Sequence, residues 1–442
     1  MMAREASTEI DAVYTNPAGT SLLSDGFHFS FTNQSAFQTR TVTSTNPIFA
    51  LNGGDATKTF EGKASAPIIP SLQAVYKKGD WALSGSIAVV GGGGKATFDL
   101  GLPSFEVLSG SAVGVVNQLT PMTQLKANQY SVEQHMEGSN FIYGAQLGGA
   151  YTINEMFSAY VGFRLNIAHN NYEGYLRNLK LNLTPASSDV YSPQLVDASA
   201  ILTAAAAAIT DPVTRNQVAI MSKASSAEGA RLSSAQNGWG VAPILGVNFN
   251  YQQRLNIGLK YEFKTAIDVE NNTKIDDTGL YSHGVNTPYD VPALFTAGAS
   301  YKIIPAMQVS LGYHHFFDSD AKMSNDKQKY AGSTNEYLAG IEYKINRLFL
   351  ISAGGQITNY GLSDEFQRDL SFSCDSYSLG FGGAVNVSEN VRLNIGYFWT
   401  TYADYTVNAP DAAAGKLTNN STIKDVYSRT NKVFVVGVDF RF

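Results

Sequence analysis

The chain contains little charge, one cysteine and no long apolar run, and each shortage excludes a class of protein. Lys, Arg, Asp and Glu make up 15% of the 442 residues, and the formal net charge of -6 includes no long basic run. A nucleic-acid partner is therefore not indicated, because nucleic acids are bound by clustered Lys and Arg. Cys374 alone permits neither an internal disulfide framework nor a multi-thiolate metal site. The longest apolar stretch, "ILTAAAAAI" at 201–209, is far shorter than the roughly twenty residues of a membrane-spanning helix.

What the chain has in abundance is alternation of apolar with small or polar residues. In "KVFVVGVDFRF", residues 432–442, an apolar residue stands at every second position from Phe434 to Phe442, and "RLNIGLKYEF" and "VRLNIGYFWT" repeat the pattern. A period of two is typical of β-strands with one apolar face. Because a soluble β-sandwich would alternate in the same way, this pattern alone does not separate a sandwich from a membrane barrel.

The connections between these segments favour the barrel. Very short connections lie near residues 78, 154, 252, 304, 346 and 389, whereas the connections between the resulting pairs are long and polar. Short turns at one end, long loops at the other and Tyr at strand ends are typical of an outer-membrane barrel. Candidate strands lie at 25–38, 67–77, 81–92, 140–152, 156–170, 239–251, 254–268, 290–302, 306–319, 335–345, 347–360, 375–387, 391–406 and 429–442. We therefore predict an all-β fold, a 14-stranded antiparallel transmembrane β-barrel with both ends on the short-turn side, the alternative being a sandwich or solenoid.

Two long-loop segments, 93–138 and 185–236, do not fit a strand. Residues 192–234 are alanine-rich with helical spacing, and Ser192-Pro193 is a plausible helix start. The segment 93–138 carries more apolar residues than a loop facing only water would need. It is interpreted as a lid over the barrel mouth, as a landing site for an apolar ligand, or as both. The candidate ligand-capture residues are Leu100, Leu102, Phe105, Val107, Leu108, Val116, Leu119 and Met122.

A rigid corner, "EIDAVYTNPAG" at 9–19, precedes the first strand. Pro17 fixes its own backbone angle and constrains Asn16, while Gly19 permits a turn. An ordinary turn before a strand is the simpler interpretation. Followed by fourteen strand candidates and a terminal Phe, however, the corner resembles the FadL/TodX family of outer-membrane transporters for long-chain fatty acids and other hydrophobic compounds.

This resemblance implies a division of the chain. Residues 1–24 would fold into the lumen as a hatch, with Asn16, Pro17, Ala18 and Gly19 at its corner, and residues 25–442 would form the barrel. In that family the third strand is kinked, which opens a gap in the wall for lateral exit. The third strand here, "DWALSGSIAVVGGGGKATF", contains Gly91, Gly92, Gly93 and Gly94, which cannot sustain a regular strand. A wall opening and a flexible loop start are both compatible with four glycines.

Catalytic and metal-binding patterns are weak. His314 and His315 in "YHHFFDSD" would point to opposite faces of a strand, so we predict no metal site. No nucleophile and base form a convincing pair, and we predict neither a catalytic residue nor a cofactor. The charges on the predicted inner face are Arg164, Lys260, Glu262, Glu342, Lys344, Arg392, Asp439 and Arg441, which we interpret as ion pairs that brace the barrel, one or two of which could bind a carboxylate headgroup.

Together the pattern and the resemblance imply a function. We expect a monomeric, non-enzymatic channel in the outer membrane of a Gram-negative bacterium, surrounded by outer-membrane lipid. It would take up hydrophobic small molecules, long-chain fatty acids or aromatic hydrocarbons, by diffusion. Phe442 resembles the terminal signal that barrel-assembly machinery recognises. A general porin, or a surface receptor or adhesin built on a barrel, is the alternative.

Overall fold

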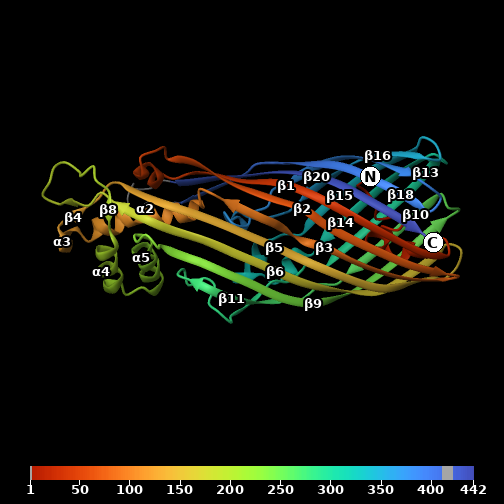
Figure 1. The fold of residues 1–442 in the computed structure, drawn as a ribbon, viewed down its shortest axis with the longest axis horizontal. Helices are drawn as coiled ribbons and strands as arrows, with labels where there is room; N and C mark the ends of the chain where they lie inside the picture. The colour runs from red at the N-terminus through yellow and green to blue at the C-terminus, as the bar shows by residue number, and fades with distance from the viewer. Residues whose placement is uncertain (1, 411–421) are drawn as a thin grey trace.

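Fourteen antiparallel wall strands close into one barrel in the computed structural model, which describes residues 2–410 and 422–442 (Figure 1). Closure is made by the first and last strands, which pair from His28 opposite Arg441 to Thr45 opposite Lys424. Both chain ends lie at the end with the short turns, here the turn end, and the helices lie at the opposite, loop end. The predicted barrel and its strand number are confirmed.

The wall strands are β1 (Gly26–Thr45), β2 (Thr57–Lys78), β3 (Trp81–Phe98), β5 (Tyr130–Thr152), β6 (Phe157–Leu181), β9 (Ala230–Tyr251), β10 (Leu255–Glu262), β13 (Leu294–Ile304), β14 (Met307–Phe316), β15 (Thr334–Lys344), β16 (Phe349–Asn359), β17 (Ser376–Asn386), β18 (Val391–Tyr402) and β20 (Thr422–Arg441). Shorter strands are β4 (Leu125–Lys126), β7 (Thr184–Pro185), β8 (Val196–Asp197), β11 (Asp268–Asp276), β12 (Asn286–Pro288) and β19 (Tyr405–Pro410). The helices are α1 (Ala12–Thr15), α2 (Pro103–Gln118), α3 (Thr120–Thr123), α4 (Ser199–Ala208) and α5 (Pro212–Ala224), with 3-10 turns η1 (Pro17–Leu22), η2 (Pro47–Asn52), η3 (Asp318–Asp320), η4 (Ser324–Tyr330) and η5 (Asp364–Phe366).

Strand length differs around the barrel. β6 has 25 residues and β5 has 23, whereas β14 has 10. About 9–11 residues suffice to span a bilayer, so the long strands continue beyond it and raise one side of the wall at the loop end. The predicted loops are accordingly shorter than 93–138 and 185–236, since residues 93–98 belong to β3, 130–138 to β5 and 230–236 to β9. Paired neighbours satisfy the backbone there, which lets the sheet continue into water.

One predicted strand, 254–268, is interrupted. β10 ends at Glu262 and β11 begins at Asp268, and both pair with β9. Between them Thr265 makes an isolated bridge to Val291. Ile267 is buried with Ile142 and Ala168 in a small apolar cluster. This burial accounts for the departure of the chain from a regular strand.

The loop-end helices share one apolar core. Val113 and Val116 of α2 pack with Leu202 of α4 and with Val218 and Met221 of α5. The predicted helix start at Ser192-Pro193 is wrong, because the first helix of that segment, α4, begins at Ser199. The second, α5, begins after Asp211, whose side chain accepts a hydrogen bond of 2.8 Å from the Thr214 amide. Of the helices in the described residues, none is long and apolar enough to cross a membrane.

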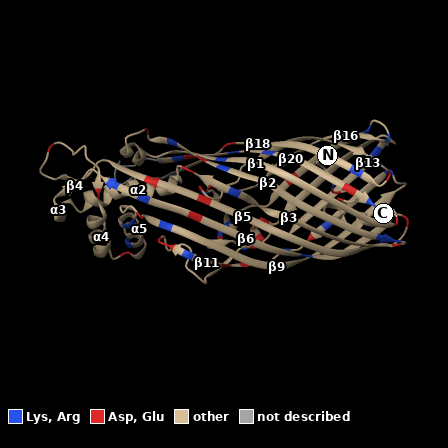
Figure 2. Ribbon diagram, viewed as in Figure 1, with Lys and Arg blue, Asp and Glu red and all other residues tan. Residues whose placement is uncertain are grey.

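The outer surface of the barrel is apolar. Figure 2 shows the wall ribbons mostly free of charged residues. Exposed apolar residues occur on strands around the barrel and include Phe31, Leu83, Ile87, Val161, Leu245, Leu311, Ile351, Ile395 and Val436. Trp81, Tyr151, Tyr251, Tyr301 and Tyr343 are exposed at the turn end. A continuous exposed apolar belt is unfavourable in water and matches the hydrocarbon of a bilayer, with aromatic side chains at its interface.

The belt can be tested by placing a charge in it. Leu245 is 45% exposed and lies opposite Val161 of β6 and Tyr261 of β10. We expect Leu245→Arg to lower the free energy of unfolding by about 2–4 kcal/mol, the cost of an arginine on the lipid face near mid-membrane. The measurement is the unfolding temperature in bilayers. It is monitored by the difference in gel migration between folded and heat-unfolded protein.

Val213→Arg is the matched control. Val213 is 66% exposed on α5, outside the barrel wall. The Val213→Arg substitution should leave the unfolding temperature unchanged. Equal effects of the two substitutions would contradict a lipid-facing belt at Leu245.

Candidate functional site

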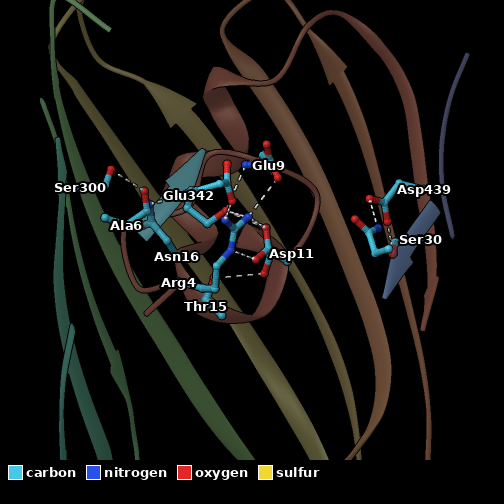
Figure 3. Close-up of polar contacts among 12 residues, drawn as sticks. Arg4, Ala6, Glu9, Asp11, Thr15, Asn16, Ser30, Ser300, Glu342 and Asp439 are labelled. Carbon is cyan, nitrogen blue, oxygen red and sulfur yellow. Dashed lines mark hydrogen bonds and ion pairs between the residues drawn. The ribbon is translucent and has the colours of Figure 1, made fainter. Parts of the chain in front are cut away.

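The N-terminal segment, residues 2–24, lies inside the barrel and is fixed there by its Asn-Pro corner (Figure 3). Asn16 is 1% exposed. Its side-chain amide donates to the Ser7 carbonyl at 2.9 Å and to Asn248 Oδ1 on β9 at 2.7 Å. Asn256 of β10 in turn donates to Asn248 and to the Ala6 carbonyl. The corner is thereby held to two adjacent wall strands by a chain of amides.

The other corner residues are also buried. Pro17 packs close to Gly246 of β9, and the Ala18 carbonyl accepts a hydrogen bond of 2.9 Å from Ser158 of β6. A Cβ atom at Gly19 would lie 2.5 Å from both Asn16 Nδ2 and the Ser7 carbonyl oxygen. Glycine is therefore required at this position by close packing.

Three wall glycines make room for the segment. Gly258 of β10, Gly298 of β13 and Gly312 of β14 lie side by side in register. A Cβ atom at each of them would overlap Glu5. The small residues that alternate with apolar ones in the sequence thus form a flat inner surface. The alternation of small with apolar residues in the sequence is a signal for such a flat inner surface. The alternation did not indicate which segment of the chain would cover that surface.

An ion-pair network ties the segment to the wall, and Arg4 is at its centre (Figure 3). Arg4 Nε lies 2.5 Å from Asp11 Oδ2, and its Nη atoms lie 3.1 Å from Glu9 and 3.5 Å from Glu342 of β15. Glu9 also pairs with Arg392 of β18 at 3.1 Å. Several charged residues, distant in sequence, therefore hold one short segment.

The predicted inner charges divide into four groups. Arg164 and Glu262 pair across the wall at 2.5 Å, as the bracing interpretation expects. Glu342 and Arg392 pair instead with the N-terminal segment. Lys344 and Arg441 are exposed, so they do not belong to the interior. Lys260 donates to the Tyr14 carbonyl at 2.9 Å, and Asp439 accepts from Ser30 and Asn394.

The two histidines point apart. His314 bridges Glu5 of the segment, at 3.0 Å, and Glu336 of β15, at 2.7 Å. His315 instead contacts Asn335 at 2.8 Å. Within residues 2–410 and 422–442, no group of three or more His, Cys, Asp or Glu side chains is arranged to hold a metal ion.

The barrel wall is interrupted between β2 and β3. Their ladder runs to Ser65 opposite Lys95 and resumes only at Ser71 opposite Ala88. Gly92 and Gly94 in the interrupted part have φ angles of 109° and 70°, which L side chains rarely adopt. A cavity of about 60 Å³ lies there, lined by Ala36, Ala66, Ile69, Val89, Gly93 and Phe141 among others.

The partner strand contributes to the interruption. Pro67 and Pro70 of β2 stand opposite the glycine stretch and have no N–H to donate to it. Sequence reasoning missed them, although two prolines inside a strand segment are a signal for a break. The gap therefore depends on residues of both strands.

A second cavity, of about 520 Å³, lies among the loop-end helices. Apolar side chains of α2, β6 and α5 line it, including Phe105, Leu108, Leu176, Val213 and Ile220. Among the other capture candidates, Leu102 and Val116 are buried in apolar clusters, Leu119 and Val107 pack against such clusters, and Leu100 and Met122 are exposed. The structure thus brings two of the eight candidates to this cavity.

Two cavities lined by both polar and apolar groups lie beside the N-terminal segment. One of about 510 Å³ separates the segment from β1, β17, β18 and β20, and one of about 850 Å³ opens at the turn end. Both are lined by Glu9, Ile10, Arg392 and Asp439. The Glu9–Arg392 ion pair therefore stands where the two cavities meet.

Comparison with known proteins gives likenesses in structure alone. No family model matches the chain, and no curated protein matches its sequence. A FadL homologue of Pseudomonas aeruginosa is 12% identical, with a TM-score of 0.65 over 100% of this chain and 96% of that one. The toluene transporters TodX of P. putida and TbuX of Ralstonia pickettii are each 15% identical, with TM-scores of 0.57 and 0.56 over 98% of this chain and 94% of theirs. The chain thus has the fold of the channels that its sequence resembles.

Docking of the N-terminal segment should depend on pH. Burial raises the pKa of the Asp11 carboxyl, but the charge and hydrogen bonds of Arg4 outweigh burial and hold that pKa below its ordinary value. The pKa of Glu9 is likewise lowered, by Arg4 and Arg392 against burial. Because both values are lower in the docked state, their stabilisation is complete above the unfolded values of about 4 and is lost as pH falls through the docked ones.

We expect residues 2–24 to be protected from amide hydrogen exchange at pH 7 and to become progressively less protected as the pH falls below the unfolded pKa values of about 4, after correction for intrinsic rates. Arg4→Met should show the weaker protection already at pH 7, because the carboxylates lose their partner. Protection that stays equal over this pH range in the unsubstituted protein would contradict this account.

Proposed function

We propose that this protein is an outer-membrane channel of a Gram-negative bacterium for the diffusion-driven uptake of hydrophobic small molecules. The interrupted ladder between β2 and β3 is the observation that carries the proposal, because it offers an apolar ligand a route from the lumen into the bilayer. The likeness to a FadL homologue and to two toluene transporters supports this class of ligand. Long-chain fatty acids and aromatic hydrocarbons are the candidate substrates.

Capture would take place at the loop end. The cavity between α2 and α5 has a volume of about 520 Å³ and is lined mainly by apolar side chains. This volume lies within the range of about 300–1,000 Å³ typical of small-molecule sites. Phe105 and Leu108 are the predicted capture residues that line it.

The N-terminal segment would act as a hatch. Its contacts with β9, β10, β14, β15 and β18 place buried polar and ionic interactions across the lumen. An apolar ligand moving straight through would have to pass the charged Glu9–Arg392 pair, where burial of an apolar surface gains nothing. The charged and polar side chains that line part of the neighbouring cavities support a porin-like route for small polar solutes as a second candidate function.

Exit would take place sideways through the β2–β3 gap. The gap cavity, at about 60 Å³, is smaller than the apolar cavity of about 150 Å³ that accommodates benzene. Strand edges at the gap must therefore separate as a ligand passes. No energy source is needed for such a route, since the ligand moves toward the phase in which its apolar surface is buried.

A disulfide across the gap tests this route. In a Cys374→Ala background, we combine Ala66→Cys with Gly94→Cys, because the Ala66 Cβ lies 3.5 Å from a Cβ position at Gly94, within the disulfide range of about 3.5–4.5 Å. The bond would hold the edges together. We expect uptake of oleate and of toluene by intact cells to fall to the level of cells without the channel, and to recover after reduction.

The two single-cysteine variants control for strain at Gly94, and conductance of small sugars in planar bilayers controls for an open lumen. Sugar conductance should stay low in every variant. Uptake that persists in the oxidised double-cysteine variant would contradict lateral exit through the β2–β3 gap. High sugar conductance in the unsubstituted protein would favour a general porin.

We propose that Phe442 serves as the assembly signal. It is 73% exposed, and its backbone pairs with Phe27, so its ring is available at the turn end. Phe442→Asp should lower the amount of protein in the outer membrane, whereas Phe442→Tyr should not, because an aromatic ring is retained. The measurement is immunoblotting of outer-membrane fractions. Unchanged levels of the Asp variant would contradict this role.

A further inference from the structure

Two arginines on the inner wall face each other without an acidic partner. Arg40 of β1 and Arg429 of β20 are directly opposite in the register that closes the barrel. Neither guanidinium is ion-paired with a carboxylate of the described residues. The Nε atoms of both are buried and have no hydrogen-bond partner there. Arg429 donates one hydrogen bond, of 3.3 Å, to Gln38 Oε1.

By itself, this arrangement of two positive charges is unfavourable. Like charges directly opposite on adjacent strands repel, and both arginines are partly buried, with no counter-ion among the described residues to offset the hydration lost at their buried Nε atoms. Other inner-wall arginines do have carboxylate partners: Arg164 pairs with Glu262, and Arg392 pairs with Glu9. This contrast among the described residues suggests that an anionic ligand completes the Arg40–Arg429 pair.

The pair lies beside the gap between β2 and β3. A Cβ atom at Gly93 would overlap the Nη2 atom of Arg40, so the guanidinium rests against the glycine stretch. Gln38, which contacts Arg429, lines the gap cavity together with Gly92, Gly93 and Gly94. Tyr402 supports Arg429 from the side, with the guanidinium carbon 5.1 Å from its ring centre.

We propose that Arg40 and Arg429 bind the carboxylate headgroup of a single-chain amphiphile while its alkyl chain enters the β2–β3 gap. Carboxylate oxygens match the planar donors of guanidinium groups, and the two positive charges would no longer be unpaired. A gap cavity of about 60 Å³ favours one narrow chain over a two-chain lipid. The inference rests on the proposed function and adds that long-chain acids are bound more tightly than neutral compounds of the same length.

The test compares an acid with its neutral ester. Binding of radiolabelled oleate and of methyl oleate is measured on protein in phosphatidylcholine nanodiscs, for the unsubstituted chain and for Arg40→Met with Arg429→Met. We expect the double variant to bind oleate about ten- to a hundredfold more weakly, the loss typical of hydrogen bonds to charged groups, and to bind the ester as before. Arg347→Met, at an exposed turn position, is the control and should change neither affinity.

Thermal stability separates a ligand site from a structural one. If the pair serves a ligand, its replacement relieves repulsion, and the unfolding temperature of the unliganded double variant should not fall. A lower unfolding temperature together with equal losses for acid and ester would overturn the inference and assign the pair a structural role. Unchanged oleate binding would overturn it while the proposed function stands. If the unsubstituted protein binds neither compound, the inference fails together with the proposed function.

Discussion

The need to satisfy every backbone N–H and C=O group in lipid governs this structure. A sheet that spans hydrocarbon has no water to bond its edges, so β1 must find β20 and the barrel must close. The same constraint explains how the wall tolerates a gap. Pro67 and Pro70 remove two donors from β2, and glycines at positive φ let β3 turn away. The interruption is built from residues that reduce its cost in hydrogen bonds.

Closure creates a lumen, and the N-terminal segment occupies part of it through polar rather than apolar contacts. Asn16, Arg4 and Glu5 each bond to the wall, and glycines on three strands give the segment room. Ion pairs shielded from water are strong only when each charge has its partner. Such an arrangement fixes one position for the segment while leaving it sensitive to changes in charge.

The sequence was sufficient for the fold because a period of two, turn spacing and loop length are local signals. It predicted fourteen strands and the loop-end helices, but it underestimated β5 and β6, since nothing in the alternation marks where lipid ends and water begins. The site was harder to predict from the sequence. Arg4 belongs to no recognisable sequence motif, and its partner Glu342 lies far from it along the chain. The opposition of Arg40 and Arg429 follows from the closing register, which no local pattern specifies.

Together these features support the proposed channel, in which the N-terminal segment obstructs the lumen and an apolar ligand leaves through the wall. The most direct measurement is photolabelling of the protein in bilayers with a radiolabelled long-chain alkane that carries a terminal diazirine, followed by mapping of the labelled peptides. The account predicts labels at residues 64–70 and 89–94, on the two edges of the gap. Labels confined to the turn-end cavity, at Leu348, Val387 and Val391, would contradict it and show that the ligand passes the N-terminal segment instead.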